Sequence, residues 1–440
     1  MTIWSPKLNA SADPLYLRIA SAIERDVDAG LLVAGSRLPT HRELARMLDV
    51  TPVTITRAYA EAARRGLVES ATGRGTFVRS ARRESAIANE IDLATNTIAV
   101  PFPAPSHAIV QRAIAALTNA QYGVGSGSER HRAAGAAWIG DVDADDVVVT
   151  AGTQHALFCA LAATTRPGDT VLAEHVTYHG VKAAAGLLDL RVVPLAQDRY
   201  GITPDALERA CRGRATKVLY TIPSLQNPTG IVMPAKRRRD LAQIAEKCGV
   251  TIIEDDIFGF LLDDPPPAFR TLAPDRTLFV TGLGKSMSPG MRIGYVAPPQ
   301  SLAGKVQNAV AASALFATPM LAEIAASWIE DGTALRLARR KREEIAVRFN
   351  LARRILDRTG TADPRSPHLW IELPRKWNVD AFVEEARRRG VRIAPASAFA
   401  IGEAPRAIRI CIGTPSTAAE LERALRVIAS IDEEAQETIV

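Results

Sequence analysis

Lys285 is the side chain in this sequence best placed to act as a nucleophile. It lies in the glycine-rich stretch TGLGKSMSPGMRIG, and Arg292 follows it seven residues later. A lysine amine forms a reversible Schiff base with an aldehyde, and an incoming amine can displace it. A single lysine is more often a surface charge, so the neighbouring motifs must decide its role.

Three further motifs carry groups that an aldehyde cofactor would need. The small-residue turn AGTQ (151–154) precedes an expected helix, and backbone N–H groups at a helix start bind phosphate. Asn227 opens an Asn-Pro-Thr-Gly turn, and the acidic run Glu254-Asp255-Asp256 ends an apolar segment. Each motif alone is common in purely structural turns and helix caps.

The elements that must position these motifs alternate between strands and helices from about residue 92 onward. Amphipathic stretches separate apolar β-type runs at 146–150, 170–173, 217–221, 251–254 and 277–280. This alternation predicts a doubly wound α/β domain, which binds its ligand at the carboxyl ends of the strands. Because the motifs fall at those ends, we expect them to gather at one site.

The order of the motifs, with Tyr178 after the AGTQ turn, resembles that of the fold type I pyridoxal phosphate enzymes. The resemblance to the class I aminotransferase group spans roughly residues 92 to 430 and implies a body with large and small lobes. It implies that Lys285 forms a Schiff base with pyridoxal 5'-phosphate. It also implies that Asp255 faces the pyridine nitrogen, with Asp256 as the alternative if the strand register differs by one.

The same resemblance implies the remaining contacts with cofactor and ligand. Asn227 would donate to the phenolic oxygen and Tyr178 would stack on the ring. The phosphate would be held by Gly152, Thr153, Gln154 and Arg292, and by Tyr122 from the partner subunit of a homodimer. Arg409, favoured over Arg406, would bind the carboxylate of an amino acid or related amine, because a guanidinium matches a carboxylate bidentately.

Two positions depart from the aminotransferase pattern. Family enzymes commonly place a tyrosine two or three residues after the pyridine-binding aspartate, where this chain has Ile257 and Phe258. The hydroxyl residue usual three positions before the lysine is replaced by Gly282, although Thr281 lies beside it. Both departures argue against fast turnover.

The first fifth of the chain is a separate basic module. The 440 residues carry a net charge of +6, and residues 1–85 hold 13 Lys or Arg against 9 Asp or Glu. Helices are expected from residue 14, from Thr40 with Glu43 completing a capping box, and from Thr51 with Pro52 at its first position. A hairpin follows at 67–78, so the pattern predicts a winged helix-turn-helix.

The motifs G-x-RLP-x-x-R-x-LA (35–45), T-x-x-RAY (54–59) and GRGTFV (73–78) resemble the GntR-type winged helix. This resemblance implies that the helix from Thr51 to Arg65 reads operator DNA in the major groove. Base-edge roles are expected for Val53, Thr54 and Arg57, and phosphate roles for Arg42 and Arg74. We expect this domain over residues 1–79, a linker over 80–91 and the aminotransferase-like domain over 92–435.

A GntR-type head fused to an aminotransferase-like body is the layout of the MocR-type regulators. The resemblance implies a pyridoxal phosphate-dependent transcriptional regulator that senses an amine-containing effector by Schiff-base exchange at Lys285. The alternatives are an active aminotransferase with an accessory DNA-binding module, and a regulator whose effector is pyridoxal phosphate itself.

Composition limits the remaining possibilities. The sequence has no apolar run of membrane-spanning length and no secretory leader, so a cytoplasmic protein without membrane contact is expected. The four cysteines lie far apart without paired spacing, which indicates reduced thiols and no metal site.

Overall fold

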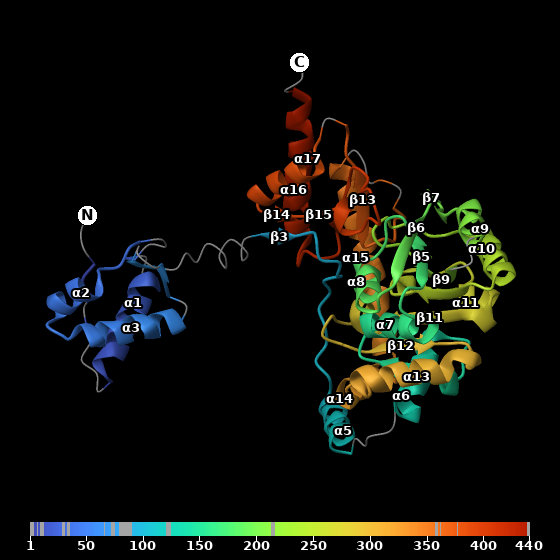
Figure 1. The fold of residues 1–440 in the computed structure, drawn as a ribbon, viewed down its shortest axis with the longest axis horizontal. Coiled ribbons are helices and arrows are strands. Elements are labelled where there is room, and N and C mark those ends of the chain that lie inside the picture. Colours follow the sequence, from blue (N-terminus) through green and yellow to red (C-terminus); the bar gives the residue numbers. More distant parts are fainter. Residues whose placement is uncertain are drawn as a thin grey trace. The chain divides into compact units, whose positions relative to one another are not determined.

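The computed structural model describes residues 4–6, 8, 13–28, 31–32, 36–65, 67–71, 75–78, 90–119, 125–212, 216–356, 360, 362–375 and 377–437. Contacts between Cα atoms divide the chain into two units, Met1–Glu90 and Ile91–Val440 (Figure 1). The second unit begins at Ile91, one residue before the expected boundary, while most of the expected linker lies outside the described residues.

The N-terminal unit has the elements of a winged helix-turn-helix, as predicted. They are α1 (Leu15–Asp28), α2 (His41–Leu48), α3 (Pro52–Arg64) and the antiparallel strands β1 (Val68–Ala71) and β2 (Gly75–Val78). The capping box at Thr40 and Glu43 and the Thr51 cap start α2 and α3 where the sequence places them. Buried apolar side chains from all three helices, including Ile19, Leu44 and Ile55, form its core.

A seven-stranded sheet organises the larger unit, in the order β4-β12-β11-β10-β9-β5-β6. Its strands are β4 (Val148–Thr150), β5 (Thr170–Glu174), β6 (Arg191–Leu195), β9 (Thr216–Thr221), β10 (Thr251–Asp255), β11 (Thr277–Gly282) and β12 (Gly294–Ala297). The pairs from β6 across to β11 are parallel, and β12 is antiparallel to both of its neighbours. The five predicted strands are present, but β6 and β12 were not predicted.

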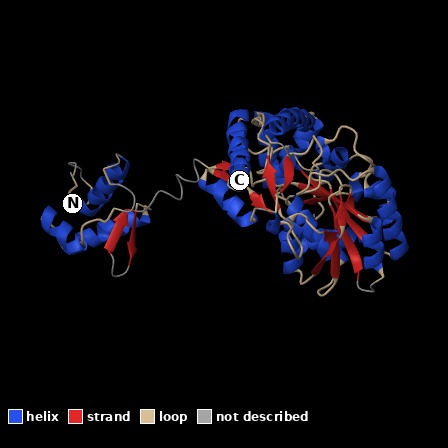
Figure 2. Ribbon diagram, turned by 90° about the horizontal axis from the view of Figure 1, so that it is seen from above, coloured by secondary structure: helices blue, strands red, loops and turns tan. Residues whose placement is uncertain are grey.

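Helices lie on both sides of these strands (Figure 2). They include α5 (His107–Thr118), α6 (Glu129–Ile139), α7 (Thr153–Thr164), α8 (His179–Leu187), α9 (Pro204–Cys211), α10 (Ala235–Cys248), α11 (Phe269–Leu272), α12 (Leu283–Ser286), α13 (Gln300–Ala314) and α14 (Pro319–Glu330). Two short strands, β7 (Gln197–Asp198) and β8 (Gly201–Ile202), form a separate hairpin. The arrangement is that of an α/β domain covered on both faces.

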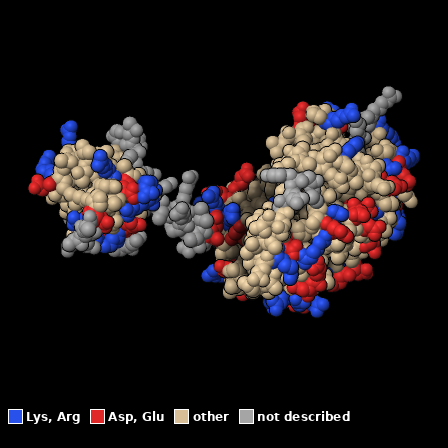
Figure 3. All heavy atoms as spheres, turned by 90° about the horizontal axis from the view of Figure 1, so that it is seen from below, with Lys and Arg blue, Asp and Glu red and all other residues tan. Residues whose placement is uncertain are grey.

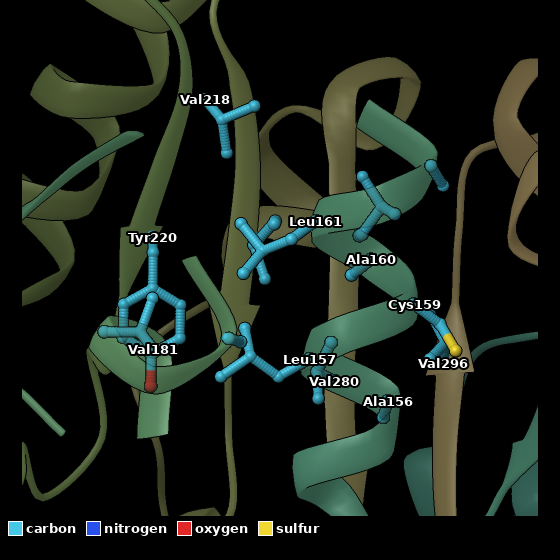
Figure 4. Packing of buried hydrophobic residues seen from close by; sticks show 14 of the residues in the cluster. Ala156, Leu157, Cys159, Ala160, Leu161, Val181, Val218, Tyr220, Val280 and Val296 are labelled. Atoms are coloured by element: carbon cyan, nitrogen blue, oxygen red, sulfur yellow. The ribbon is translucent and has the colours of Figure 1, made fainter. Parts of the chain in front are cut away.

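Apolar side chains of α7 anchor it on the sheet. Leu157 and Leu161 lie among strand residues such as Val218, Val280 and Val296 (Figure 4). Both leucines are buried, which fixes the axis of the helix relative to the strands. This packing aims the N-terminus of α7 at the carboxyl ends of the strands.

A smaller lobe completes the unit. It contains β3 (Ile91–Asp92), β13 (His368–Glu372), α16 (Val379–Arg388), β14 (Val391–Arg392), β15 (Ala394–Pro395), β16 (Ala407–Cys411) and α17 (Ala418–Glu437). The strands form a β13-β16-β15 sheet and a β14-β3 pair. The helix α15 (Thr333–Ile355) contributes side chains at its C-terminal end to the apolar core of this lobe.

Candidate functional site

One cavity of about 600 Å³ gathers the predicted site residues of the body. Nine of them line it: Gly152, Thr153, Gln154, Tyr178, Asn227, Asp255, Lys285, Arg292 and Arg409. All except Arg292 and Arg409 lie on or just after β4, β5, β9, β10 or β11, at the strand ends where they were expected. Tyr122, which was also predicted for this site, and Arg74, which was predicted for the DNA-binding head, lie outside the described residues.

Lys285 lies on α12, directly after the buried strand β11. Its Nζ donates a hydrogen bond to the main-chain oxygen of Asn96. Burial lowers the pKa of Lys285, and the nearby Arg409 and Arg292 lower it further. A lowered pKa leaves more of the amine uncharged near neutral pH, which is the form that attacks an aldehyde.

Asp255, rather than Asp256, lines the cavity. Its Oδ2 accepts a hydrogen bond of 2.7 Å from the Tyr220 hydroxyl, and its Oδ1 has no hydrogen-bond partner among the described residues. Burial raises the pKa of Asp255 to about 7, against the lowering effect of Tyr220. The Asp256 carboxylate instead accepts a hydrogen bond from Ser224.

The N-terminus of α7 and Arg292 form another wall of the cavity. Gly152 caps the helix with φ +91°, and a Cβ there would lie 2.9 Å from Arg292 Nη2. Only glycine adopts this positive φ without strain and also leaves room for the Arg292 guanidinium. At Gly282, a Cβ would overlap Thr153 Oγ1, so the threonine hydroxyl fills the space of the side chain absent at that position.

Arg409 lies on β16 and is almost fully buried. Its Nη1 donates to Asn227 Oδ1 at 2.8 Å, its Nη2 donates to the Ala94 main-chain oxygen, and its guanidinium carbon lies 4.5 Å from the centre of the Phe399 ring. Arg406, the disfavoured candidate, is exposed and donates to the Arg375 main-chain oxygen.

Tyr178 and Phe258 supply aromatic surface around the cavity. Tyr178 is half-buried at the start of α8, and burial raises the pKa of its hydroxyl, with Asp255 adding to the effect. Phe258, at one of the two positions where a tyrosine is usual, is buried and packs against His368 at 5.6 Å between ring centres. The phenolic donor missing at this position is therefore replaced by an apolar contact.

The predicted DNA-contacting residues of the N-terminal unit that the structure describes lie on α2 and α3. Arg42, Val53 and Arg57 are exposed, and Val53 keeps 63% of its accessible surface. Thr54 is half-buried, and its hydroxyl lies 3.0 Å from that of Thr51. The opposite face of α3 packs into the core, where the Tyr59 hydroxyl donates to the Pro39 main-chain oxygen at 2.8 Å.

Comparisons with known proteins agree with this geometry. Residues 88–428 match the family described as aminotransferase class I and II, and residues 15–78 match the bacterial regulatory proteins of the gntR family. This chain belongs to the aminotransferase class I and II family. With its GntR-type head, it has the domain combination of the MocR-type regulators.

Full-length relatives share both parts of this aminotransferase-family chain. It is 30% identical over 442 residues to the uncharacterized HTH-type transcriptional regulator YdeF of Bacillus subtilis, covering 97% of this chain and 96% of the relative. It is 24% identical over 440 residues to the regulator YdfD of the same organism, covering 88% and 90%.

Solved aminotransferases share the fold of the body. The multiple substrate aminotransferase of Thermococcus profundus matches with a TM-score of 0.71 at 22% identity, covering 82% of this chain and 96% of that one. The α-aminoadipate aminotransferase LysN of Thermus thermophilus, complexed with N-(5'-phosphopyridoxyl)-L-leucine, matches with a TM-score of 0.71 at 23% identity, covering 86% and 99%.

The cavity of this family member fits pyridoxal phosphate. The unpartnered Oδ1 of Asp255 provides an acceptor for a pyridinium N–H. The α7 N-terminus, with Gly152 and Arg292 beside it, provides N–H donors and positive charge for a phosphate. The amine of Lys285 lines the same cavity.

Sequence reasoning missed several residues that support this site. Asn96 lines the cavity, and its Nδ2 lies 3.0 Å from His368 Nδ1, while His368 Nε2 lies 2.9 Å from the Gln226 main-chain oxygen. Tyr220 lies in the β-type run expected at 217–221, and its hydroxyl is one of the polar groups in that run. A polar group in a strand expected to be buried was the signal that could have indicated a role for Tyr220.

Proposed function

We propose that this protein is a pyridoxal phosphate-dependent transcriptional regulator that senses an amino acid or another amine. The observation that carries the proposal is that nine residues predicted from separate motifs line one cavity, in a chain that also has a GntR-type head. The cofactor site does not explain the presence of the DNA-binding head, and the head does not explain the presence of the cofactor site. A cofactor site needs no DNA-binding head, and a DNA-binding head needs no reactive lysine.

Eight of the nine predicted residues that line the cavity have a proposed role in holding the cofactor. The bound cofactor supplies an aldehyde that forms a Schiff base with an amine, and exchange of Lys285 for the effector amine is the sensing step. Asp255 keeps the ring nitrogen protonated, Asn227 binds the phenolic oxygen, and Tyr178 covers the ring face. The phosphate is bound by Gly152, Thr153, Gln154 and Arg292, which have the donors and charge for it.

Arg409 is proposed to select effectors that carry a carboxylate. Its guanidinium is held by Asn227 and the Ala94 main chain, and its Nε has no partner among the described residues. Buried guanidinium groups bind carboxylates through paired hydrogen bonds. We also propose a cytoplasmic homodimer in which Tyr122 of each subunit contacts the phosphate in the other.

The head is proposed to bind operator DNA through α3. Arg57, Val53 and Thr54 would contact base edges, and Arg42 and Arg74 phosphates. DNA binding should weaken as salt rises, because phosphate contacts release counterions. Exchange of Arg42 and Arg57 for alanine should reduce binding to DNA upstream of its own gene, while Arg64→Ala, whose guanidinium pairs with Glu61, should not. Unchanged binding after loss of Arg42 and Arg57 would refute the assignment.

The cofactor half is tested by an absorbance scan of the purified protein with pyridoxal phosphate and a panel of amines. The wild-type protein should show the visible band of a lysine-bound cofactor, and an effector amine should shift it. Lys285→Ala should lack the band. A wild-type protein without it would contradict the proposal.

A second candidate function is an active aminotransferase. It is favoured by the match of the body to solved aminotransferases and by the intact set of Lys285, Asp255 and Arg409 in one cavity. Ile257 and Phe258 argue against it, because neither can donate a hydrogen bond to the cofactor. Sustained conversion of an amino acid and a 2-oxo acid would establish it.

A further inference from the structure

The helix α15 carries two buried cations on one face. Lys341 and Arg348 are 2% and 1% exposed, and they lie with Ala338, Ile345 and Ala352 on the buried side of the helix. Burying a charge is unfavourable unless hydrogen bonds compensate, and an apolar side chain of similar volume would stabilise the fold at least as well. The partners of the two cations therefore indicate what they do.

The Lys341 ammonium binds the main chain at the reactive lysine. Its Nζ donates to the main-chain oxygens of Lys285 at 2.7 Å and Met287 at 2.8 Å. The helix α12 that carries Lys285 spans only four residues, so the carbonyl groups at its end lack partners within the helix. Lys341 supplies those partners from α15 and so holds this short turn in place.

Arg348 also donates hydrogen bonds to main-chain oxygens, in the segment that follows β16. Its Nη1 donates to the main-chain oxygens of Ile412 at 3.0 Å, Gly413 at 3.2 Å and Pro415 at 2.7 Å. These residues follow β16, the strand of Arg409. Seven residues separate Lys341 from Arg348, a rise of about 10 Å along the helix. The two cations thus hold two separate main-chain segments from one rigid element.

We propose that Lys341 is a positioning residue, which holds the main chain of Lys285 so that its amine reaches the cofactor aldehyde. This inference rests on the cofactor role of Lys285 proposed above. Without the two hydrogen bonds, the turn at Lys285 has no other described anchor for these carbonyl groups, and the amine samples more positions. Lys341 itself is not among the residues that line the cavity.

The test compares full-length variants by titration with pyridoxal phosphate. Lys341→Met and Lys341→Gln both shorten the side chain by one bond. The methionine removes the donors, whereas the glutamine keeps two N–H donors on its amide. For each variant we would measure cofactor affinity and the fraction of bound cofactor that borohydride fixes to Lys285, by intact mass. Loss of two hydrogen bonds should weaken affinity about tenfold or more in Lys341→Met. Lys341→Gln should fall between Lys341→Met and the wild type in both measurements.

Arg348→Met is the matched control, because it removes an equally buried cation from the same face and leaves the Lys285 carbonyl bound. It should lose at least as much stability in thermal unfolding, because it also breaks the 2.6 Å ion pair between Arg348 and Glu344, but it should keep the wild-type fraction of trapped cofactor. The proposal is overturned if Lys341→Met traps the wild-type fraction, or if Arg348→Met lowers the fraction equally. Should Lys341→Met not fold, an unchanged fraction in Lys341→Gln overturns it. A wild-type protein that traps no cofactor would instead refute the role of Lys285.

Discussion

Tyr220 influences the ionisation of the Asp255 carboxylate in the cavity. Its hydroxyl donates to Asp255 Oδ2 and so stabilises the ionised form that a pyridinium needs, while burial opposes ionisation. Tyr220→Phe should raise the pKa of Asp255 above its value of about 7 and weaken pyridoxal phosphate affinity by about tenfold, the effect of one hydrogen bond to a charged group. Fluorescence titration with the cofactor at pH 7 and pH 8.5 measures both effects.

Tyr295→Phe provides the control for this change. Tyr295 is equally buried in the same sheet, on β12, and does not line the cavity. It should leave cofactor affinity unchanged. If Tyr220→Phe also binds with wild-type affinity at both pH values, the hydrogen bond to Asp255 has no role in cofactor binding.

His368 makes the stability of the body depend on pH. Burial, followed by the nearby Arg409, lowers the pKa of this residue to about 3. The unfolded chain, with a histidine pKa near 6.5, binds a proton below that pH that the native state does not, so stability falls as the pH falls. Between pH 7 and pH 5 the free energy of unfolding should drop by about 2 kcal/mol more in the wild type than in His368→Gln. Urea unfolding followed by tryptophan fluorescence tests this, and parallel pH profiles would contradict it.

The sequence predicted reactive or polar residues that stand in recognisable motifs at the ends of strands. It did not predict residues whose roles depend only on how the helices pack. Lys285, Asp255 and Asn227 each stand in a motif that turns at the end of a strand. Lys341 lies 56 residues from the carbonyl group it binds, within an arginine-rich helix. Its burial depends on which face of α15 packs against neighbouring helices such as α12, α14 and α17, and the side-chain periodicity of so charged a helix does not determine that face.

Among the elements, the N-terminus of α7 is the one whose backbone geometry matters most to the site. Gly152→Ala would place a Cβ 2.9 Å from Arg292 Nη2 at a φ of +91°, so both the helix start and the arginine must shift. We expect the preference for pyridoxal phosphate over pyridoxal to shrink by about tenfold or more, because the phosphate loses N–H donors and a charged partner. Competition between the two compounds measures that preference.

Gly186→Ala in α8 is the control, since a Cβ there meets no atom within 4 Å. It should keep the wild-type preference for the phosphate. An unchanged preference in Gly152→Ala would show that the phosphate does not bind at the N-terminus of α7.

The expected strands were right because each was a continuous apolar run, whereas β12 was not predicted because its residues overlap the end of the lysine motif.

At the scale of the whole molecule, charge is distributed unevenly between the two parts. The first 85 residues carry four of the six net positive charges, and acidic and basic side chains are interspersed on the face of the body in Figure 3. Net charge alone did not indicate DNA binding, but its concentration in the head did. No helix in the described residues has the length and hydrophobicity to cross a membrane.

If the body senses amines and the head binds DNA, the two events must be thermodynamically linked. An amine that changes operator affinity by a given factor must itself bind more tightly or more weakly by the same factor when operator DNA is present. We expect a factor of about ten for the effector, within the range usual for coupled sites, and a factor of one for Lys285→Ala. Operator binding with and without each amine, and amine titrations with and without the operator, give the two factors independently. A change in operator affinity with pyridoxal phosphate alone, and none with any amine, would make the cofactor itself the effector. Unequal factors would mean that the absorbance change and the DNA response report different binding events.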